Sequence, residues 1–481
     1  MVEWGIKKDR RDIVIKEYIL WGMLLVCILF LAGCSEKDLP SKSEDGALTY
    51  AALNKPSEQV LSSIEDFNEN HPDTPIEILD YSDEFGLERL GTELALGRVP
   101  DIMEMYRAGK GDDRVSLSKI YEERPEGEYW MPYRQMAEKG YLEDLWPYIR
   151  RDEAELKYGQ NGLQETPLKA AEVNGGLYLI FQRVTINTLV GPQRLVGDRC
   201  GWTFEELLET FSAMPEGSSI LRHYLTQADM FRQMAVPLLD QYVDWRTGQC
   251  AFDSDGFREL LLFLASFPDE FQTLLSQNAL YEECAQRMLG GKQMLEAASC
   301  SGITNVTSLD THFDDQVSFV GYPTSDGSPG SMFVPHGTIL AMSSACRNKE
   351  AAWAYMSQLL NRNLRSVSQI DYILYVKTKI PINKADYARV CKYDLARHTM
   401  ATGGPSGFLS PNLVSIDTPD KQDKERFDAL IDNTCLFYWP DDALADVVWE
   451  SIGPYLAGDR GLDGTIALVQ NRAMLYVNEN R

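Results

Sequence analysis

The sequence predicts an α/β fold whose N-terminal part contains a parallel sheet. Between residues 48 and 105, short apolar segments typical of strands alternate with segments of helical periodicity. The order strand–helix–strand–helix–strand is typical of a parallel sheet covered by helices. About 435 residues follow residue 46, which is enough for two or three domains of ordinary size.

The first elements are indicated by local patterns. We expect a strand at 48–53 (LTYAAL), followed by a helix in which the apolar residues of 60–67 recur at helical spacing. His71 and Pro72 end this helix, and alternating apolar residues at 76–78 predict a second strand.

A second helix and a third strand are expected next. Residues 85–96 have the pattern of a helix, with Gly97 as its C-terminal stop and Pro100 beyond it. Residues 102–105 then predict a third strand.

The middle of the chain is expected to be mostly helical. Thr203 and Glu206 have the spacing of a capping box, which predicts a helix start. Strands are expected at 317–321 and 338–342. One apolar helix face is formed by Phe257, Leu260, Leu261 and Leu264.

The C-terminal third is predicted to contain helices and one long loop. Helices are expected at 351–360 and around Asp371, and residues 402–424 are rich in turn-forming residues and predict a surface loop. The chain is expected to end in helices, with one apolar face formed by Ile466, Val469 and Ala473.

The N-terminus has the pattern of a secretory signal. Residues 1–18 contain several basic side chains, and an apolar run of thirteen residues follows at 19–31 (ILWGMLLVCILFL). This run is shorter than the roughly 20 residues of a membrane-spanning helix. The following L-A-G-C resembles the bacterial lipobox, which implies cleavage of residues 1–33 and a diacylglycerol on Cys34. The alternatives are an uncleaved signal anchor and an ordinary thiol.

The segment after Cys34 predicts a tether. Residues 35–46 (SEKDLPSKSEDG) are polar and lack an apolar face, so they predict a flexible linker that follows the lipidated cysteine over 34–46. The localisation expected from these features is the extracellular face of a bacterial cell membrane.

Charge and cysteine usage exclude some functions. The net charge of −26 disfavours nucleic-acid binding and adsorption to anionic lipid. The cysteines beyond residue 34 are odd in number and lack a C-x-x-C spacing, so they indicate neither a disulfide framework nor a zinc site. We interpret them mostly as small buried hydrophobes. They are Cys200, Cys250, Cys284, Cys300, Cys346, Cys391 and Cys435.

Several short blocks occur in an order and spacing that resemble one family, the extracellular solute-binding proteins of ABC importers, of the sugar-binding type related to maltose-binding protein. The blocks are 67–72 (FNENHP), 94–102 (LALGRVPDI), 141–145 (YLEDL), 174–178 (NGGLY), 201–207 (GWTFEEL), 321–327 (GYPTSDG), 351–353 (AAW) and 470–472 (QNR) with Tyr476 and Glu479. One departure is Gly176, where the family usually has lysine.

The resemblance implies a two-lobe periplasmic-binding-protein-like fold of type II. Each lobe is expected to be a sheet flanked by helices, with the ligand in a cleft between lobes. Lobe one would comprise 47–182 and 317–362, and lobe two 183–316 and 363–481. The crossings between them are expected near 181–183, 317–323 and 361–364. Implied partners are a carbohydrate, membrane permease subunits and their ATPase.

A sugar requires aromatic platforms for its C–H faces and polar groups for its hydroxyls. In parallel sheets, ligands meet the loops that follow the strands. The strand ends, the predicted crossings and the late F-Y-W-P run together give the candidate ligand-binding residues. These are Asn54, Lys55, Tyr81, Tyr106, Arg107, Tyr178, Gln182, Arg183, Ser299, Ser301, His336, Tyr438 and Trp439.

Tyr178 and Trp353 have core packing as an alternative to ligand contact. For His336 the alternative is a polar residue whose hydrogen bonds are made within the protein. Acidic pairs such as Asp314-Asp315 and Asp441-Asp442 are interpreted as solvated turns.

Catalytic and metal patterns are absent from the sequence. There is no G-x-S-x-G and no H-E-x-x-H, and the five histidines show no metal-ligand spacing. Ser116 and Lys119 match S-x-x-K, but no K-T-G follows. Asp253 and Asp255 suggest a calcium loop, which lacks its final glutamate because Leu262 is at that position, so a helix start is preferred.

The sequence therefore predicts a monomeric, lipid-anchored receptor that captures a carbohydrate, preferably an oligosaccharide, for an ABC importer. No enzymatic activity, cofactor or metal is expected. The alternatives are a receptor for a peptide or another polar solute, a surface glycoside hydrolase, and a receptor that presents its ligand to a sensor kinase.

Overall fold

The computed structural model describes residues 46–109, 128–271, 277–361, 379–396, 400–402, 414–416 and 418–480. Outside these residues lie the signal at 1–33, Cys34, the tether up to residue 45, the helix around Asp371, residues 362–364 of the expected crossing near 361–364, and most of the loop at 402–424. Within the described ranges, no helix has the length and apolar character needed to cross a membrane.

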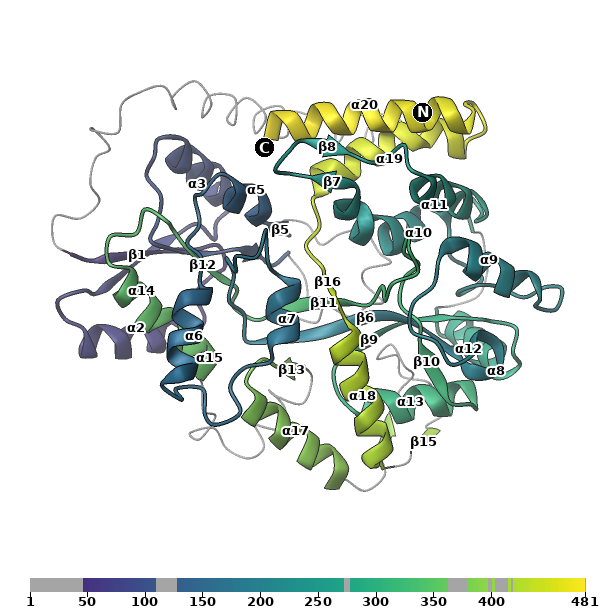
Figure 1. The fold of residues 1–481 in the computed structure, drawn as a ribbon, viewed down its shortest axis with the longest axis horizontal. Coiled ribbons are helices and arrows are strands. Elements are labelled where there is room, and N and C mark those ends of the chain that lie inside the picture. Colours follow the sequence, from purple (N-terminus) through teal and green to yellow (C-terminus); the bar gives the residue numbers. More distant parts are fainter. Residues whose placement is uncertain are drawn as a thin grey trace.

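A four-stranded sheet, on the left in Figure 1, organises the N-terminal part of the chain. Its strands lie in the order β12 (Leu340–Met342), β3 (Ile102–Glu104), β1 (Leu48–Ala52) and β2 (Ile76–Asp80). β1 pairs in parallel with β2 and β3, whereas β12 is antiparallel to β3. The predicted α/β layer with a parallel sheet is therefore confirmed. We call this sheet and its helices the first lobe.

Helices of the first lobe cover the stretches 60–67, 85–96 and 351–360 in which the sequence predicted helices. The Ser57 hydroxyl accepts a hydrogen bond from the Val60 amide and starts α2 (Glu58–Asn70), which buries Ile64 and Phe67. α3 (Gly86–Ala95) passes so close to the end of β2 that a Cβ at Gly86 would lie 1.8 Å from the Tyr81 carbonyl oxygen. Only glycine fits there. α14 (Lys349–Met356) and α15 (Gln358–Asn361) occupy the predicted helix at 351–360.

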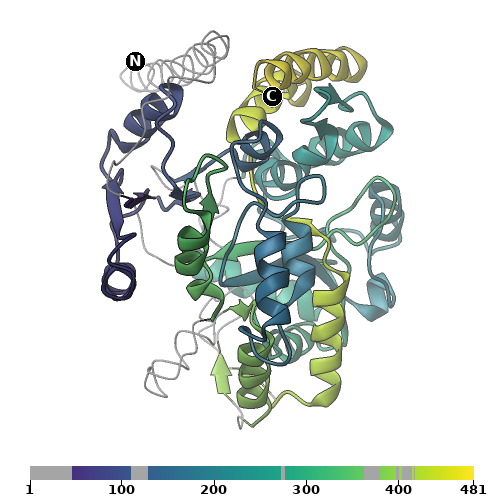
Figure 2. The same cartoon turned by 60° about the vertical axis from the view of Figure 1, so that its left-hand side comes forward.

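Three further helices continue the first lobe. They are α5 (Tyr133–Glu138), α6 (Trp146–Ala154) and α7 (Glu165–Ala170). The segment after α5 joins the first sheet, because Leu142 bridges Ser343 and the Glu143 amide donates to the Met342 carbonyl. α6 is attached to α14 through the Trp353 indole, which donates to Asp152 at 2.8 Å. Figure 2 shows α6 and α7 between the first sheet and α18 (Lys421–Asn433).

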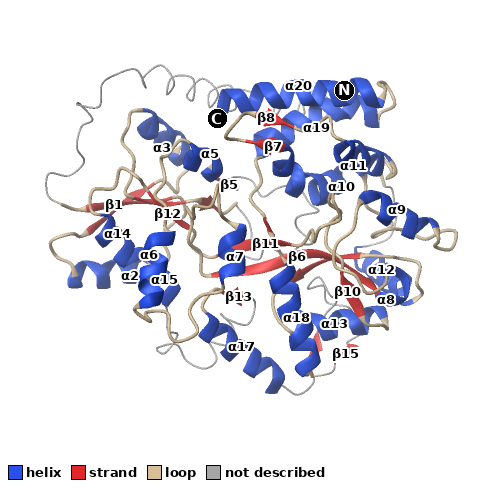
Figure 3. Ribbon diagram, viewed as in Figure 1, coloured by secondary structure: helices blue, strands red, loops and turns tan. Residues whose placement is uncertain are grey.

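A second, six-stranded sheet is built around the ten-residue strand β6 (Arg183–Pro192). Its other strands are β9 (Glu296–Cys300), β10 (Val317–Phe319), β11 (Met332–His336), β13 (Ile380–Pro381) and β16 (Leu436–Phe437). β9, β10, β11 and β13 are antiparallel to β6, and β16 is parallel to β11. Figure 3 shows the two groups of strands side by side, with helices around them. We call this sheet and its helices the second lobe.

The strand pairings change one part of the predicted division of the chain. The sequence assigned residues 317–336 to lobe one, but β10 and β11 pair with β6 in the second sheet. The ten-residue strand β6 is long enough to pair with both β10 and β11. The chain returns to the first sheet only after His336, where Ile180 bridges Leu340. The crossing expected near 317–323 is therefore wrong, and the segment between β11 and β12 crosses instead.

Helices and two short ribbons complete the second lobe. Its helices are α8 (Gln193–Val196), α9 (Phe204–Ser212), α10 (Gln227–Met230), the π-helix η1 (Phe231–Ala235), the 3-10 helix η2 (Val236–Tyr242), α11 (Asp255–Ala265), α12 (Gln277–Leu289), α13 (Thr304–Phe313), α17 (Lys384–Ala396), α18, α19 (Asp442–Leu456) and α20 (Leu462–Asn480). The ribbons are β7 (Val243–Asp244) with β8 (Gln249–Cys250), and β14 (Met400–Thr402) with β15 (Val414–Ile416).

Several local predictions are confirmed in this lobe, and one is corrected. Thr203 and Glu206 form the capping box of α9, the expected apolar face of α11 is buried, and Ser254 caps α11. Asp253 and Asp255 therefore lie at a helix start, as preferred. The loop predicted at 402–424 is too long, because β15 and the first turn of α18 lie within it.

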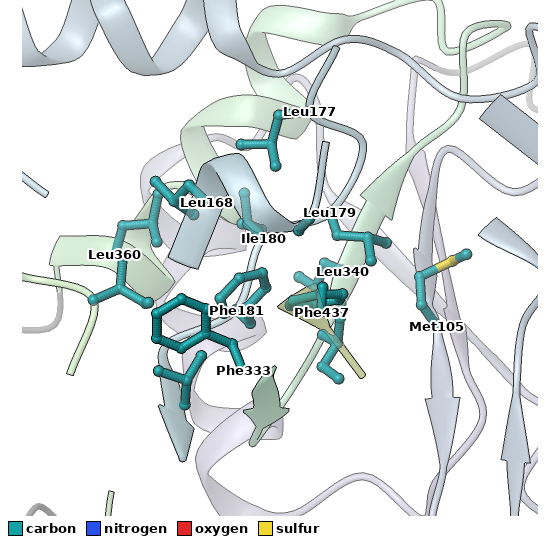
Figure 4. Packing of buried hydrophobic residues seen from close by; sticks show 14 of the residues in the cluster. Met105, Leu168, Leu177, Leu179, Ile180, Phe181, Phe333, Leu340, Leu360 and Phe437 are labelled. Atoms are coloured by element: carbon teal, nitrogen blue, oxygen red, sulfur yellow. The ribbon is translucent and has the colours of Figure 1, made fainter. Parts of the chain in front are cut away.

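The apolar core is continuous across the junction of the two sheets. Figure 4 shows Phe181, just before β6, and Leu340 of β12 packed with Phe333 of β11 and Phe437 of β16. A second core lies under α9, α11, α19 and α20. The crossing segments are thus anchored by buried side chains.

Candidate functional site

Four aromatic side chains meet where the two lobes face each other. Tyr106, in β4 (Tyr106–Arg107), is paired with Trp130, in β5 (Tyr129–Trp130), and their ring centroids are 4.3 Å apart. Trp439, just after β16, lies 4.7 Å from Trp130, and Tyr438 lies 5.9 Å from it. We call these four residues the aromatic cluster. Tyr106, Trp130 and Tyr438 remain partly exposed.

The cluster contains residues of both lobes. Tyr106 follows β3 of the first sheet, and Tyr438 follows β16 of the second. The Trp439 indole also donates to the Met131 carbonyl at 2.8 Å. Sequence analysis selected Tyr106, Tyr438 and Trp439, which the structure brings together, but missed Trp130 at their centre. The run of three aromatic residues in 129–133 (YWMPY) was the available signal.

Asn54 and Glu104 set the position of β4. The Glu104 carboxylate accepts hydrogen bonds from the Tyr50 hydroxyl at 2.8 Å and from the Asn54 side chain at 3.0 Å. The Asn54 side chain also donates to the Tyr106 carbonyl and accepts from the Ala108 amide, each at 2.8 Å. Both polar atoms of Asn54 are therefore engaged within the first lobe. The arrangement makes Asn54 a support for Tyr106.

A charged contact joins the lobes beside the aromatic cluster. The Arg134 Nε on α5 lies 3.0 Å from an Asp240 carboxylate oxygen on η2. The other Arg134 nitrogens donate to the carbonyls of Trp439 and Phe437, at 3.0 and 3.3 Å. The Arg134 side chain is only 16% exposed, so its attraction to Asp240 is screened less than on an open surface.

A second polar contact lies one residue further along α5. Gln135 donates to Asp441 at 2.9 Å, and the Tyr476 hydroxyl of α20 donates to the same carboxylate at 2.9 Å. Burial raises the pKa of Asp441. Asp441 also caps α19 by accepting from the Leu444 amide. The interpretation of Asp441 as a solvated turn residue is therefore wrong, because tertiary contacts surround it.

Three further candidates of the first lobe are not part of the aromatic cluster. Tyr81 is 3% exposed and donates to Glu93, and burial raises the pKa of its phenol. Arg107 donates to the carbonyls of Ser82 and Asp83, and Lys55 is exposed. Tyr81 follows a strand but is buried. A position at a strand end is therefore not enough to make a side chain accessible to a ligand.

Three more candidates occupy separate places. Tyr178 is half-buried against the main core, as its competing interpretation held. Ser299 is paired with Asn187 inside the second sheet, and the amide of Ser301 donates to Asn305. Gln182, Arg183 and His336 form another group, at the crossing segments.

The described residues contain one arrangement that resembles a thiol nucleophile with a base. Cys284 Sγ lies 3.8 Å from His223 Nδ1, and His223 Nε2 lies 3.6 Å from Glu283. Cys284 is buried, and this burial raises its pKa to about 12. The thiol is therefore protonated and inaccessible at neutral pH, which makes it a poor nucleophile. No group of three or more His, Cys, Asp or Glu suited to a metal ion occurs within the described ranges.

These features define a class of fold: two α/β lobes joined by crossing segments, with side chains of both lobes meeting between them. The fold is shared with solved structures. A periplasmic oligogalacturonide binding protein from Yersinia enterocolitica matches over 90% of this chain and 100% of its own, with 14% identity and a TM-score of 0.50. The predicted two-lobe fold is confirmed by this likeness.

Other solved structures align over similar lengths. The sugar-binding protein MalE from Xanthomonas citri matches over 90% of this chain and 97% of its own, with 14% identity and a TM-score of 0.48. The galacto-N-biose-/lacto-N-biose I-binding protein from Bifidobacterium longum matches over 92% and 99%, with 14% identity and a TM-score of 0.43. No family model matches the sequence, and no curated protein matches it.

Proposed function

We propose that this protein is an extracellular receptor that captures a carbohydrate between its two lobes and delivers it to an ABC importer. The observation that supports the proposal best is the aromatic cluster, which brings partly exposed aromatic residues of both lobes together beside Arg134 and Asp240. Aromatic faces pack against the C–H surfaces of sugars, and charged side chains hydrogen-bond to hydroxyls.

The mechanism proposed is binding coupled to movement of the lobes, without bond chemistry. A ligand that contacts both lobes stabilises their closed arrangement by its differential affinity for that arrangement. The fold is shared with an oligogalacturonide binding protein, which agrees with a solute-binding role. Peptide binding, glycoside hydrolysis and presentation to a sensor kinase remain the alternative functions.

A glycan screen tests the proposal. Purified full-length protein in detergent is heated with members of a carbohydrate library, and unfolding is followed by calorimetry. A sugar at 100 times its dissociation constant adds about 2.7 kcal/mol of stability. Tyr106→Ala should remove this gain without unfolding the protein, because it deletes one ring of the cluster.

Tyr106→Phe is the control, since it keeps the ring and loses only the hydroxyl that donates to Glu128. If a peptide from a library stabilises the protein and no glycan does, the ligand is a peptide and the carbohydrate proposal is wrong. A glycan that is cleaved during the incubation would establish a hydrolase.

We also propose that the receptor is a monomer and that a lipid on Cys34 tethers it to the membrane. The reason for proposing the lipid anchor is that the signal pattern, the lipobox and the polar tether occur in that order. Cys34→Ala should then release unprocessed or soluble protein from the membrane fraction, since no thiol would remain for lipid attachment. Immunoblotting of membrane and soluble fractions, with mass spectrometry of the product, measures this. If the variant stays in the membrane and its mass differs from that of the parent protein only by the substitution, the segment is a helical anchor and not a lipoprotein signal.

A further inference from the structure

Two exposed cysteines lie beside one short segment of the second lobe. Among the seven cysteines that the structure describes, Cys200 and Cys435 are exposed, whereas Cys250 is half-buried and the other four are buried. Cys200 lies between α8 and α9, and Cys435 directly precedes β16. The interpretation of the cysteines as small buried hydrophobes is therefore confirmed for four of them but is wrong for this pair.

The segment that both cysteines adjoin is 327–329. A Cβ at Gly201 would lie 2.4 Å from the Gly327 carbonyl oxygen and 3.0 Å from the Pro329 nitrogen, so the backbone next to Cys200 packs directly against this segment. The Cys435 thiol contacts the same segment, because its Sγ donates to the Pro329 carbonyl at 3.2 Å. Pro329 is therefore a neighbour of both positions, although they are far apart in the sequence.

The two thiols also act on each other through space. Burial raises the pKa of Cys200, and the charge that Cys435 carries as a thiolate raises it further, which agrees with their shared neighbour. An S–S bond is about 2 Å long, so the side chains must rotate toward each other before one forms. Both residues are exposed and lie outside helices and strands, which leaves room for this rotation.

We propose that Cys200 and Cys435 form a reversible disulfide that fastens the segment between α8 and α9 to the start of β16. The oxidant is a small organic disulfide, RSSR, acting by thiol–disulfide exchange. One protein thiolate attacks RSSR, forms a mixed disulfide and releases one RSH. The second protein thiolate attacks the protein sulfur of this mixed disulfide and releases the second RSH. The protein loses two hydrogen atoms in total, and RSSR gains them.

This bond would act on the strand that leads to the aromatic cluster, because β16 is followed directly by Tyr438 and Trp439. Disulfides persist in oxidising surroundings outside the cell, where the proposed receptor would act. The inference goes beyond carbohydrate capture and does not require that a sugar binds.

The test treats folded full-length protein in detergent with 2-hydroxyethyl disulfide at about pH 8, where a fraction of the thiols is ionised. This reagent is uncharged, which avoids repulsion by Asp326 near Cys435. The remaining thiols are alkylated in urea, and tryptic peptides are analysed by mass spectrometry without reduction. We expect peptides 200–222 and 427–460, which contain one cysteine each, to appear as one linked species. Dithiothreitol should separate them again.

Variants and unfolded protein provide the controls. Cys200→Ser should stop the reaction at the mixed disulfide on Cys435, because no second thiol is available. Cys250→Ser is the matched control and should give the linked species as wild type does, since Cys250 is not part of the pair. Treatment of the wild type in urea should abolish the preference for this pair. If Cys200 and Cys435 of the folded wild type each stop at the mixed disulfide, or pair equally with other cysteines, the proposal is wrong.

The unfolding temperature gives a second measurement. The disulfide closes a long loop of the unfolded chain, so oxidation should raise the unfolding temperature of the wild type but not that of Cys435→Ser. A linked species with an unchanged unfolding temperature would show that the bond does not fasten the two segments. Failure of the glycan screen would leave either result standing, because no sugar is present.

Discussion

At the scale of single residues, the functional proposal depends on side chains whose surroundings come from distant parts of the chain. Trp130 contacts Tyr106 and Trp439, which are 24 residues before it and 309 after it. Asn54 was selected as a ligand contact because it follows a strand. The structure engages its amide with Glu104 and Tyr106 instead. A polar residue at a strand end can therefore be recognised from the sequence. Whether its side chain bonds to a ligand or to other residues depends on its hydrogen-bond partners in the fold.

Asp394 gives a prediction of pH dependence. It lies on α17 and is 3% exposed, and one of its carboxylate oxygens has no hydrogen-bond partner among the residues that the structure describes. Burial raises its pKa to about 6 from an ordinary value of 3.8. The folded state therefore binds this proton more tightly than the unfolded state does. The contribution of Asp394 to stability is greatest below pH 4 and is lost as pH rises through about 6.

We expect Asp394→Asn to remove this loss, because the amide cannot ionise. At pH 8 the variant should be more stable than wild type by up to about 3 kcal/mol, and the difference should shrink towards pH 4. Urea unfolding at a series of pH values measures this. Asp432→Asn, at an exposed position of α18, is the control. A constant difference across the pH range would show that Asp394 is not the titrating group.

At the scale of elements, short local patterns placed helix starts well. The Thr203 hydroxyl accepts from the Glu206 amide, and the Glu206 carboxylate accepts from the Thr203 amide at 2.9 Å. The two residues that form the box are three positions apart, so no tertiary contact is needed to specify it. The cap of α2 by Ser57 and that of α11 by Ser254 are equally local.

Thr203→Ala should lower the free energy of unfolding by about 1 kcal/mol, because it leaves the Glu206 amide at the start of α9 without its side-chain acceptor. Thr203→Ser retains the hydroxyl and should cost much less. Chemical denaturation of both variants measures the difference. Equal losses in alanine and serine variants would attribute the effect to the threonine methyl group rather than to the cap.

At the scale of the whole molecule, polar contacts join the two lobes. Arg134 of the first lobe binds Asp240 and two carbonyls of the second. Gln135 reaches Asp441, and Asp441 is bound in turn by Tyr476 of α20. If a ligand binds between the lobes as proposed, the ligand and these contacts stabilise the same arrangement of the lobes. Loss of the contacts should favour an open one.

We expect ligand to reduce the radius of gyration of the wild type measured by X-ray scattering. Arg134→Gln should increase the radius in the absence of ligand, because it removes the charge that pairs with Asp240. Arg151→Gln is the control, since Arg151 pairs with Glu350 inside the first lobe. The ligand should be recovered intact by mass spectrometry. An unchanged radius together with a cleaved glycan would instead establish an enzyme with a fixed cleft.

The sequence by itself determined the order and type of the N-terminal strands and helices, the α9 capping box and the α/β fold class. Each depends on residues close together in the chain, where hydrophobic period, caps and turns have local causes. The resemblance to solute-binding proteins correctly predicted two lobes. Tyr106, chosen because it follows a strand, and Trp439, chosen from the late F-Y-W-P run, stay predicted ligand contacts.

Only the tertiary structure decided that β10 and β11 belong to the second sheet, because strand pairing is a contact between residues more than 100 positions apart. It also placed Trp130 among the other aromatic rings and brought Cys200 and Cys435 beside the same segment, 327–329. Side chains from separate strands become neighbours only when the sheet forms. Which side chains share a face depends on how the paired strands are aligned, and no short segment of sequence specifies that alignment by itself.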